Sequence, residues 1–243
     1  MSYQKRAHLL HLSALTTWKS NTLRLLTLLA ALTFATTAAA EIEKVAAPRD
    51  YTPIEQAQIG TREDGLGVKN GHQIGDVTLE QFGADALALS DLWNEQPLLI
   101  VFYRGGWCPF CNTQIKEMSD NYGQFEKLNV LPVFISVDKP DVASLTSQTY
   151  SIPFPVLSDT ALSAHTEFNV VNKISDEQRA RMAKRGLDFD EWSGSNHGVI
   201  AHASTFLVDS KGVVQWSTVV KDYRSRPTLE QLLAAIQQWK SNP

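Results

Sequence analysis

The sequence predicts an α/β fold with a central mixed β-sheet flanked by helices. Two observations predict it. Apolar runs typical of strands buried on both faces alternate with segments of helical periodicity. An antiparallel hairpin pattern and an amphipathic helix then come last in the chain. We find no internal repeat, so a single domain is expected.

The first 40 residues are predicted to be an export signal rather than part of the fold. They carry four positive charges and no acidic residue, and the apolar run 25–35 has signal-peptide length. This run is too short to span a membrane comfortably. Small residues at Ala38 to Ala40 predict cleavage after Ala40, hence a periplasmic or otherwise exported protein. An uncleaved anchor is the alternative, because the positive region is unusually long.

Charge and cysteine usage restrict the class of protein. Removing the signal takes the net charge from −4 to −8, and an acidic chain without a basic run is a poor nucleic-acid binder. No cysteine precedes Cys108 and no Arg-Arg pair lies in the signal, so neither a lipid anchor nor twin-arginine export is expected. After signal cleavage we expect no stable membrane association.

The predicted domain starts after an irregular lead-in. Residues 41–74 contain prolines, the turn signal Asn70-Gly71 and a short helical pattern at 54–58. Residues 75–243 are predicted to form the α/β domain. Its first part, 76–93, carries two short patterned runs, of which the first predicts a strand and the second enters a helical turn at Ser90.

Two buried strands with a helix between them form the predicted centre of the domain. The run 98–103 is apolar apart from the Tyr103 hydroxyl, and Gly105-Gly106 ends it. A helical pattern follows from Pro109 to about Lys127. The run 131–137 predicts the second buried strand.

The segments after the second strand are shorter. A helix is predicted from Asp138 and Pro140 to about residue 148, and another over 161–168. Pro155 restricts the run 154–157 to an edge strand or a loop.

A polar, charge-rich segment at 172–196 is predicted to be inserted into the sheet topology. Ser175 and Gln178 form a capping-box pattern, and Gly186 lies where the helix would stop. We interpret this segment as a solvated helix. The alternative is a lid facing the substrate, because long insertions often carry function.

The C-terminal part predicts a hairpin and a closing helix. Runs at 204–208 and 213–219 flank a turn pattern, and Thr228 with Gln231 caps a helix with one apolar face. A parallel strand–helix–strand unit followed by a hairpin and a helix outlines a thioredoxin-like fold.

The chemistry is predicted at Cys108 and Cys111, the two cysteines of the chain. Their Cys-x-x-Cys pattern closes almost no loop, so a structural disulfide is a weak explanation. Cys108 would cap the helix with Pro109 in its first turn, where free N–H groups lower a thiol pKa from about 8.5 to about 3.5–7.5. Cys108 is therefore the predicted attacking thiolate, and Cys111, one turn further in, the resolving thiol.

Neighbouring residues are candidates for supporting roles. Trp107 would form an apolar platform over the site, unless it is simply a half-buried aromatic. Arg104 would stabilise the thiolate or a polarised peroxide oxygen, unless it is a solvated edge residue. A zinc site formed by the Cys pair with His197 and His202 is a further alternative, although the spacing is longer than in compact zinc motifs.

The chain resembles the AhpC/TSA group of the thioredoxin superfamily, in particular its peroxiredoxin-like branch. The resemblance spans about residues 75–239 and implies a thioredoxin fold with peroxide or disulfide chemistry. By position, Cys108 resembles the peroxidatic cysteine and Cys111 the resolving one. The matching segments are FYRGGWCPFC at 102–111, LPVFISVD at 131–138, FPVLSD at 154–159, STFLVDSKG at 204–212 and KDYRSRP at 221–227.

The chain departs from the family pattern at three positions. Val101 and Gly105 occupy the places of the Pro and Thr of a standard peroxiredoxin, and Ala203 occupies that of its Arg or of a cis-proline. Arg104 or Arg226 would have to replace the missing arginine. His202, beside Ala203, is either a proton donor facing the Cys pair or an ordinary loop histidine.

The leading hypothesis is a thiol-specific antioxidant enzyme that reduces hydroperoxides. Cys108 becomes a sulfenic acid, Cys111 condenses with it, and an external reductant, a thioredoxin-like protein or a small thiol, reduces the disulfide. The first alternative is a thiol–disulfide oxidoreductase acting on protein disulfides through the same pair. The second is a metal-binding or redox-sensing module. No cofactor and no resident metal are expected.

Overall fold

The computed structural model describes residues 45–63 and 65–241. The predicted export signal and its cleavage site therefore lie outside the described residues. Within the described ranges, no helix has both the length and the apolar character needed to cross a membrane.

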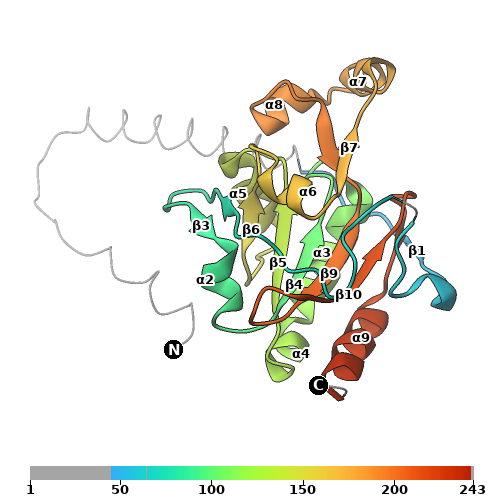
Figure 1. The fold of residues 1–243 in the computed structure, drawn as a ribbon. Helices are drawn as coiled ribbons and strands as arrows, with labels where there is room; N and C mark the ends of the chain where they lie inside the picture. Colours follow the sequence, from blue (N-terminus) through green and yellow to red (C-terminus); the bar gives the residue numbers. More distant parts are fainter. Residues whose placement is uncertain (1–44, 64, 242–243) are drawn as a thin grey trace, which may run out of the picture. The chain divides into compact units, whose positions relative to one another are not determined.

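A five-stranded mixed sheet forms the centre of the domain, as predicted (Figure 1). β4 pairs in parallel with β5 and antiparallel with β9, while β6 and β10 lie at the two edges. The order across the sheet is β10 (Val214–Val219), β9 (Ser204–Val208), β4 (Leu98–Phe102), β5 (Leu131–Ser136) and β6 (Val156–Ser158).

The apolar run of β4 occupies the middle of this sheet because both of its faces are covered. All five residues of the strand are buried. Alternate side chains point to opposite faces of a strand, so Leu99 and Val101 enter one core while Ile100 and Phe102 enter the other. A polar residue in β4 would leave its side chain without water on either face.

Helices cover both faces of the sheet. The first core contains the cysteines and side chains of the helices that cover one face: α3 (Pro109–Asp120), α4 (Tyr122–Lys127), α5 (Pro140–Thr149) and α9 (Leu229–Ser241). The second core packs against the opposite face and takes its helical side chains from α2 (Leu89–Trp93) and α6 (Ser163–Glu167).

The single helix predicted over 109–127 is interrupted. α3 ends at Asp120 and α4 begins at Tyr122, because Asn121 between them adopts φ −113° and ψ 18°. The Asn121 side-chain amide donates to the Glu117 carbonyl at 2.9 Å. Asparagine competes in this way with backbone helix bonds, and the break follows.

Three two-stranded pairs surround the central sheet, and the sequence pattern predicted only one of their strands, within residues 77–82. β2 (Thr78–Leu79) pairs antiparallel with β3 (Leu87–Ala88), and β7 (Val171–Lys173) with β8 (Val199–Ala201). β1 (Thr52–Pro53) pairs in parallel with β11 (Ser225–Arg226) and is followed by the short 3-10 helix η2 (Gln56–Gln58). The lead-in is thus hydrogen-bonded to the segment before α9.

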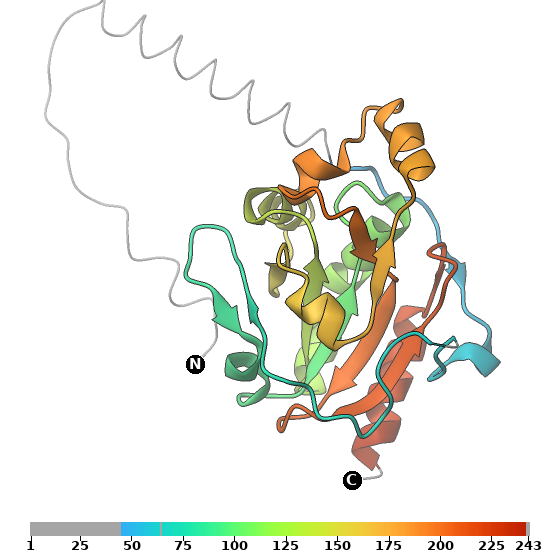
Figure 2. The same cartoon turned by 45° about the horizontal axis from the view of Figure 1, so that its top comes forward.

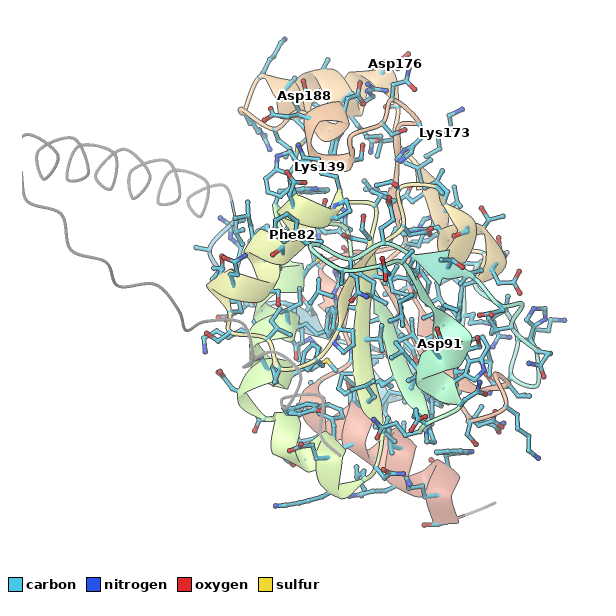
Figure 3. All side chains as sticks on the ribbon, turned by 90° about the vertical axis from the view of Figure 1, so that its left-hand side faces the viewer. Phe82, Asp91, Lys139, Lys173, Asp176 and Asp188 are labelled. Carbon is cyan, nitrogen blue, oxygen red and sulfur yellow. The ribbon has the colours of Figure 1, made fainter. Side chains whose placement is uncertain are left out.

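The inserted segment between β7 and β8 forms two helices at one end of the molecule (Figures 1 and 2). α7 (Asp176–Ala183) has the predicted capping box and no buried residue, as expected of a solvated helix. α8 (Phe189–Ser193) was not predicted, and it buries Phe189 and Trp192 in the core that holds the cysteines. Figure 3 shows Asp176 and Asp188 of this segment beyond Lys139, whose N–H donates to the Trp192 carbonyl at 2.9 Å.

Candidate active site

The Cys-x-x-Cys lies where β4 leads into α3. Cys108 has extended backbone angles and caps α3, with Pro109 as its first residue, as predicted. The Cys108 N–H donates to the Gly105 carbonyl at 3.0 Å, which closes the turn before the helix. Both cysteines are free thiols, and both are buried, with relative exposures of 0% and 1%.

The turn before Cys108 requires glycine. Gly105 has φ +134°, which side chains rarely adopt, and a Cβ placed there would lie 2.4 Å from the Trp107 indole nitrogen and 2.6 Å from Asp138 Oδ1. A Cβ on Gly106 would lie 2.2 Å from Thr146 Oγ1. The threonine of the standard peroxiredoxin pattern is therefore incompatible with this turn.

Arg226 approaches the cysteines from β11. Its side chain is 3% exposed, and Nη2 donates to the Cys111 sulfur at 3.2 Å while Nη1 donates to the Ser225 carbonyl at 3.3 Å. The pairing of Pro53 with Arg226, and the Ile54 N–H that donates to the Arg226 carbonyl at 2.9 Å, hold its backbone. Of the two arginines proposed to replace the family's arginine, Arg226 is the one in side-chain contact with a cysteine.

Arg104 lies at the rim of the same site. Its guanidinium carbon is 3.8 Å from the centre of the Tyr223 ring and 4.9 Å from that of Trp107. Stacking of this kind orients the charge without placing it on the sulfur. The main-chain N–H and the charge of Arg104 both contribute to lowering the pKa of Cys111.

The two thiols have opposite pKa shifts. Burial raises the pKa of Cys108, and the hydrogen bond to Cys111 with its negative charge raises it further. Burial also opposes ionisation of Cys111, but the hydrogen bond from Cys108 and the charge of Arg226 outweigh it and lower the pKa of Cys111 to about 5. The pair thus holds one proton, and its negative charge rests on Cys111.

This charge distribution differs from the sequence prediction, which placed the thiolate on Cys108. The reason is the position of the positive charge. Cys108 caps α3, but it is fully buried and its side chain makes no capping hydrogen bond. Arg226, in contrast, contacts the sulfur of Cys111. The sequence pattern locates the start of the helix but not the arginine that meets its first turn.

Two further candidate residues, Trp107 and His202, differ in their surroundings. Trp107 is 9% exposed, and its ring meets Phe189 of α8 edge-on at 5.0 Å, so α8 covers it. The His202 N–H donates to the Val170 carbonyl at 2.8 Å, and its Nδ1 has no partner among the described residues. Burial and the charge of Lys221 lower the pKa of His202, which is therefore neutral at pH 7.

The described residues do not assemble the alternative metal site. In residues 45–63 and 65–241, no group of three or more His, Cys, Asp or Glu side chains is arranged to hold a metal ion. His197 Nδ1 accepts from the Val199 N–H at 3.0 Å. Burial lowers the pKa of His197, and His165 and Asp190 are among the charged groups that act on it.

Two polar residues of the site were not predicted. Asn112 is fully buried and donates from Nδ2 to the carbonyls of Gly106 and Ala46, both at 2.7 Å. Asp138 is fully buried and accepts from the Gly106 N–H at 2.8 Å. A carboxyl directly after a buried strand was a visible signal for Asp138, whereas nothing in the sequence pattern points to the contact of Asn112 with the lead-in.

Comparisons with known proteins indicate the family of this chain. The sequence profile of the AhpC/TSA family matches residues 70–217. A putative peroxiredoxin, ycf42 of Pyropia yezoensis, is 30% identical over 166 residues, which cover 65% of this chain and 71% of the relative. The chloroplastic peroxiredoxin Q of Populus jackii is 28% identical over 148 residues, which cover 61% of this chain and 59% of the relative.

Solved structures show the same fold. The crystal structure of peroxidoxin BcpB from Mycobacterium tuberculosis aligns with a TM-score of 0.56 at 16% sequence identity, over 73% of this chain and 99% of that one. The match to the family profile covers more than half of the chain and includes both cysteines. The chain therefore belongs to the AhpC/TSA family, as a peroxiredoxin-like thiol oxidoreductase with a thioredoxin fold.

Proposed function

We propose that this protein is an exported thiol peroxidase that reduces hydroperoxides through its Cys108–Cys111 pair. The observation that carries the proposal is the contact of the buried Arg226 guanidinium with the Cys111 sulfur at the first turn of α3. A thiolate is the reactive form of cysteine, and this charge keeps the pair anionic at neutral pH.

The first step forms a sulfenic acid. The two sulfurs share one proton, so its transfer from Cys108 to Cys111 generates the attacking Cys108 thiolate. The sulfur attacks the hydroperoxide, the O–O bond breaks, and the sulfur is oxidised by two electrons. The departing alkoxide or hydroxide takes the proton from Cys111 and leaves as an alcohol or water, so Cys111 is again a thiolate. We assign the attack to Cys108 because its place before α3 corresponds by position to the peroxidatic cysteine of the AhpC/TSA family, to which the chain belongs.

The second step forms a disulfide. The Cys111 thiolate attacks the sulfenic sulfur of Cys108, an S–S bond forms, and the hydroxyl group leaves as water once it has gained a proton. An external reductant, either a thioredoxin-like protein or a small thiol, then reduces the disulfide and restores both cysteines.

The burial of the site favours a small substrate over a protein disulfide. With both sulfurs at most 1% exposed, a hydroperoxide needs only a narrow opening, whereas a protein disulfide needs α8 or the lead-in to move aside. Thiol–disulfide exchange on proteins stays the alternative, because the Cys-x-x-Cys at a helix start is also the arrangement of thioredoxin-like oxidoreductases.

Rapid mixing of the reduced protein with hydrogen peroxide tests the proposal. We expect disulfide formation much faster than the oxidation of free cysteine, and slow reduction of insulin disulfides by the same preparation. Peroxide oxidation no faster than that of free cysteine, together with rapid insulin reduction, would establish the alternative instead.

Export is supported by the sequence pattern of residues 1–40 alone. Cell fractionation with N-terminal sequencing tests it. We expect a mature chain that begins at Glu41 in the exported fraction, and an intact N-terminus on a membrane-bound chain would support the uncleaved anchor.

A further inference from the structure

Asp138 is a buried carboxyl directly beneath the turn that leads to Cys108. Its side chain is 0% exposed, and Oδ2 accepts from the Gly106 N–H at 2.8 Å. Its other oxygen, Oδ1, has no hydrogen-bond partner within the described ranges, and it lies 2.6 Å from where a Cβ on Gly105 would be. A buried carboxyl oxygen without a partner is costly when charged and needs an explanation.

The groups around Asp138 are protic and come from several elements. Tyr103, after β4, and Thr146, in α5, are buried and carry hydroxyl groups. Ser136 of β5 stabilises the carboxylate by a hydrogen bond, and the titratable groups that interact electrostatically with it are Cys111 of α3 and the Tyr103 phenol. These groups form a buried polar cluster next to the cysteine pair.

The charge of Cys111 contributes to the protonation of Asp138. Burial raises the pKa of Asp138 to about 7, and the negative charge of the Cys111 thiolate contributes to that rise. When the thiolate is consumed in a disulfide, this contribution disappears and the pKa of Asp138 falls. Oxidation of the cysteines therefore favours release of the proton from Asp138.

Oxidation of the cysteines removes the negative charge that Arg226 contacts at Cys111. In the reduced state its Nη2 donates to the Cys111 thiolate, and a disulfide carries no charge. A site that ionises another buried group on oxidation retains its net charge. Asp138 is the buried carboxyl on which the charge of Cys111 acts.

We propose that Asp138 stores the proton that disulfide formation consumes and takes it back when the disulfide is reduced. This inference rests on the proposed function. The reduced pair (one thiol and one thiolate) and a hydroperoxide give a disulfide, an alcohol and a hydroxide. Protonated Asp138 converts that hydroxide to water and becomes a carboxylate. An external dithiol then supplies two electrons and two protons, of which one returns to a cysteine and one to Asp138.

Proton uptake per disulfide formed tests this inference. The reduced protein is mixed with one equivalent of hydrogen peroxide in weakly buffered solution with a pH indicator, and disulfides are counted by thiol titration. Between about pH 5 and about pH 7 the wild type is expected to take up less than one proton, because Asp138, protonated in the reduced state, supplies part of the one required. Above about pH 7 it is expected to take up about one.

Asp138→Asn should take up about one proton per disulfide across the whole range, because an amide stores none. Asp141→Asn removes an exposed carboxylate of α5 and should behave like the wild type. An infrared difference spectrum of the wild type should lose a protonated-carboxyl band on oxidation, a readout that does not depend on the variant folding. Uptake of one proton by the wild type between about pH 5 and about pH 7, with no change in that band, overturns the inference.

A second oxidant separates this inference from the proposed function. A small-molecule disulfide oxidises the same pair and leaves one thiolate product, which needs the same proton as the hydroxide does. If peroxide does not react while the small disulfide shows the predicted proton counts, the peroxidase proposal fails and the role of Asp138 stands. If both oxidants react and the wild type matches Asp138→Asn, the role of Asp138 fails alone.

Discussion

Arg226 Nη2 lies 3.2 Å from the Cys111 sulfur, although 115 residues separate the two in the chain. The pairing of β1 with β11 creates this contact, because it fixes the backbone of Arg226 beside the first turn of α3. The strand pair thus places a buried cation on the thiol that the sequence pattern assigned to the resolving role. The reactivity of the cysteine pair depends on this long-range contact as much as on the helix that carries it.

Replacing Arg226 should make the thiolate less stable and so raise the pKa of the cysteine pair. A hydrogen bond to a charged group contributes about 1.5–3 kcal/mol, so Arg226→Ala should raise the pKa of the cysteine pair by about one to two units. Spectroscopic titration of the thiolate in the ultraviolet measures this shift. Arg226→Lys, which keeps the charge but not the planar donor, should fall between the two. An unchanged thiol pKa in Arg226→Ala would show that another group stabilises the anion.

The rate of peroxide reduction should decrease in acid. The pKa of Cys111 is lowered to about 5, so the anionic pair is present above that pH and gains a proton as the pH falls through it. The second-order rate constant with hydrogen peroxide, measured by stopped flow from pH 4 to pH 8, should level off above about pH 6. A rate that keeps rising up to pH 8 or beyond would mean that the pair carries no anion at neutral pH.

Introducing a side chain at Gly105 should destabilise the fold. A Cβ would lie 2.4 Å from the Trp107 indole nitrogen at φ +134°, so Gly105→Thr should cost about 2 kcal/mol or more in unfolding free energy. Urea denaturation measures the change. Gly123→Ala in α4, where nothing lies within 4 Å, is the matched control and should be neutral or stabilising by about 0.5–1 kcal/mol. Equal stability of the two variants would contradict the observed turn.

Much of the fold was predictable from the sequence because its signals are local. The apolar run of β4 and the hairpin pattern of β9 and β10 indicated the sheet, and the capping pairs of α7 and α9 located two helices. The break at Asn121 and the short α8 were missed, since a side-chain hydrogen bond and tertiary packing determine them. Short strands such as β1 carry almost no periodic signal.

The candidate site was predictable only in part, for a related reason. The cysteine pair lies in one contiguous motif, and its position at the start of α3 was expected. The contact of Arg226 with Cys111 and the burial of Asp138 depend on residues that meet only after folding. The pKa of a buried thiol depends on such neighbours, so the location of the negative charge could not be predicted from spacing.

Trapping of the sulfenic acid after a single exposure to hydrogen peroxide tests the central claim most directly. In Cys111→Ser the resolving thiol is missing, so we expect a sulfenic acid on Cys108 that a diketone reagent captures and mass spectrometry locates. Cys108→Ser should react no faster than free cysteine. A trapped sulfenic acid on Cys111 in Cys108→Ser, formed at the wild-type rate, would contradict the assignment of Cys108 as the attacking thiol.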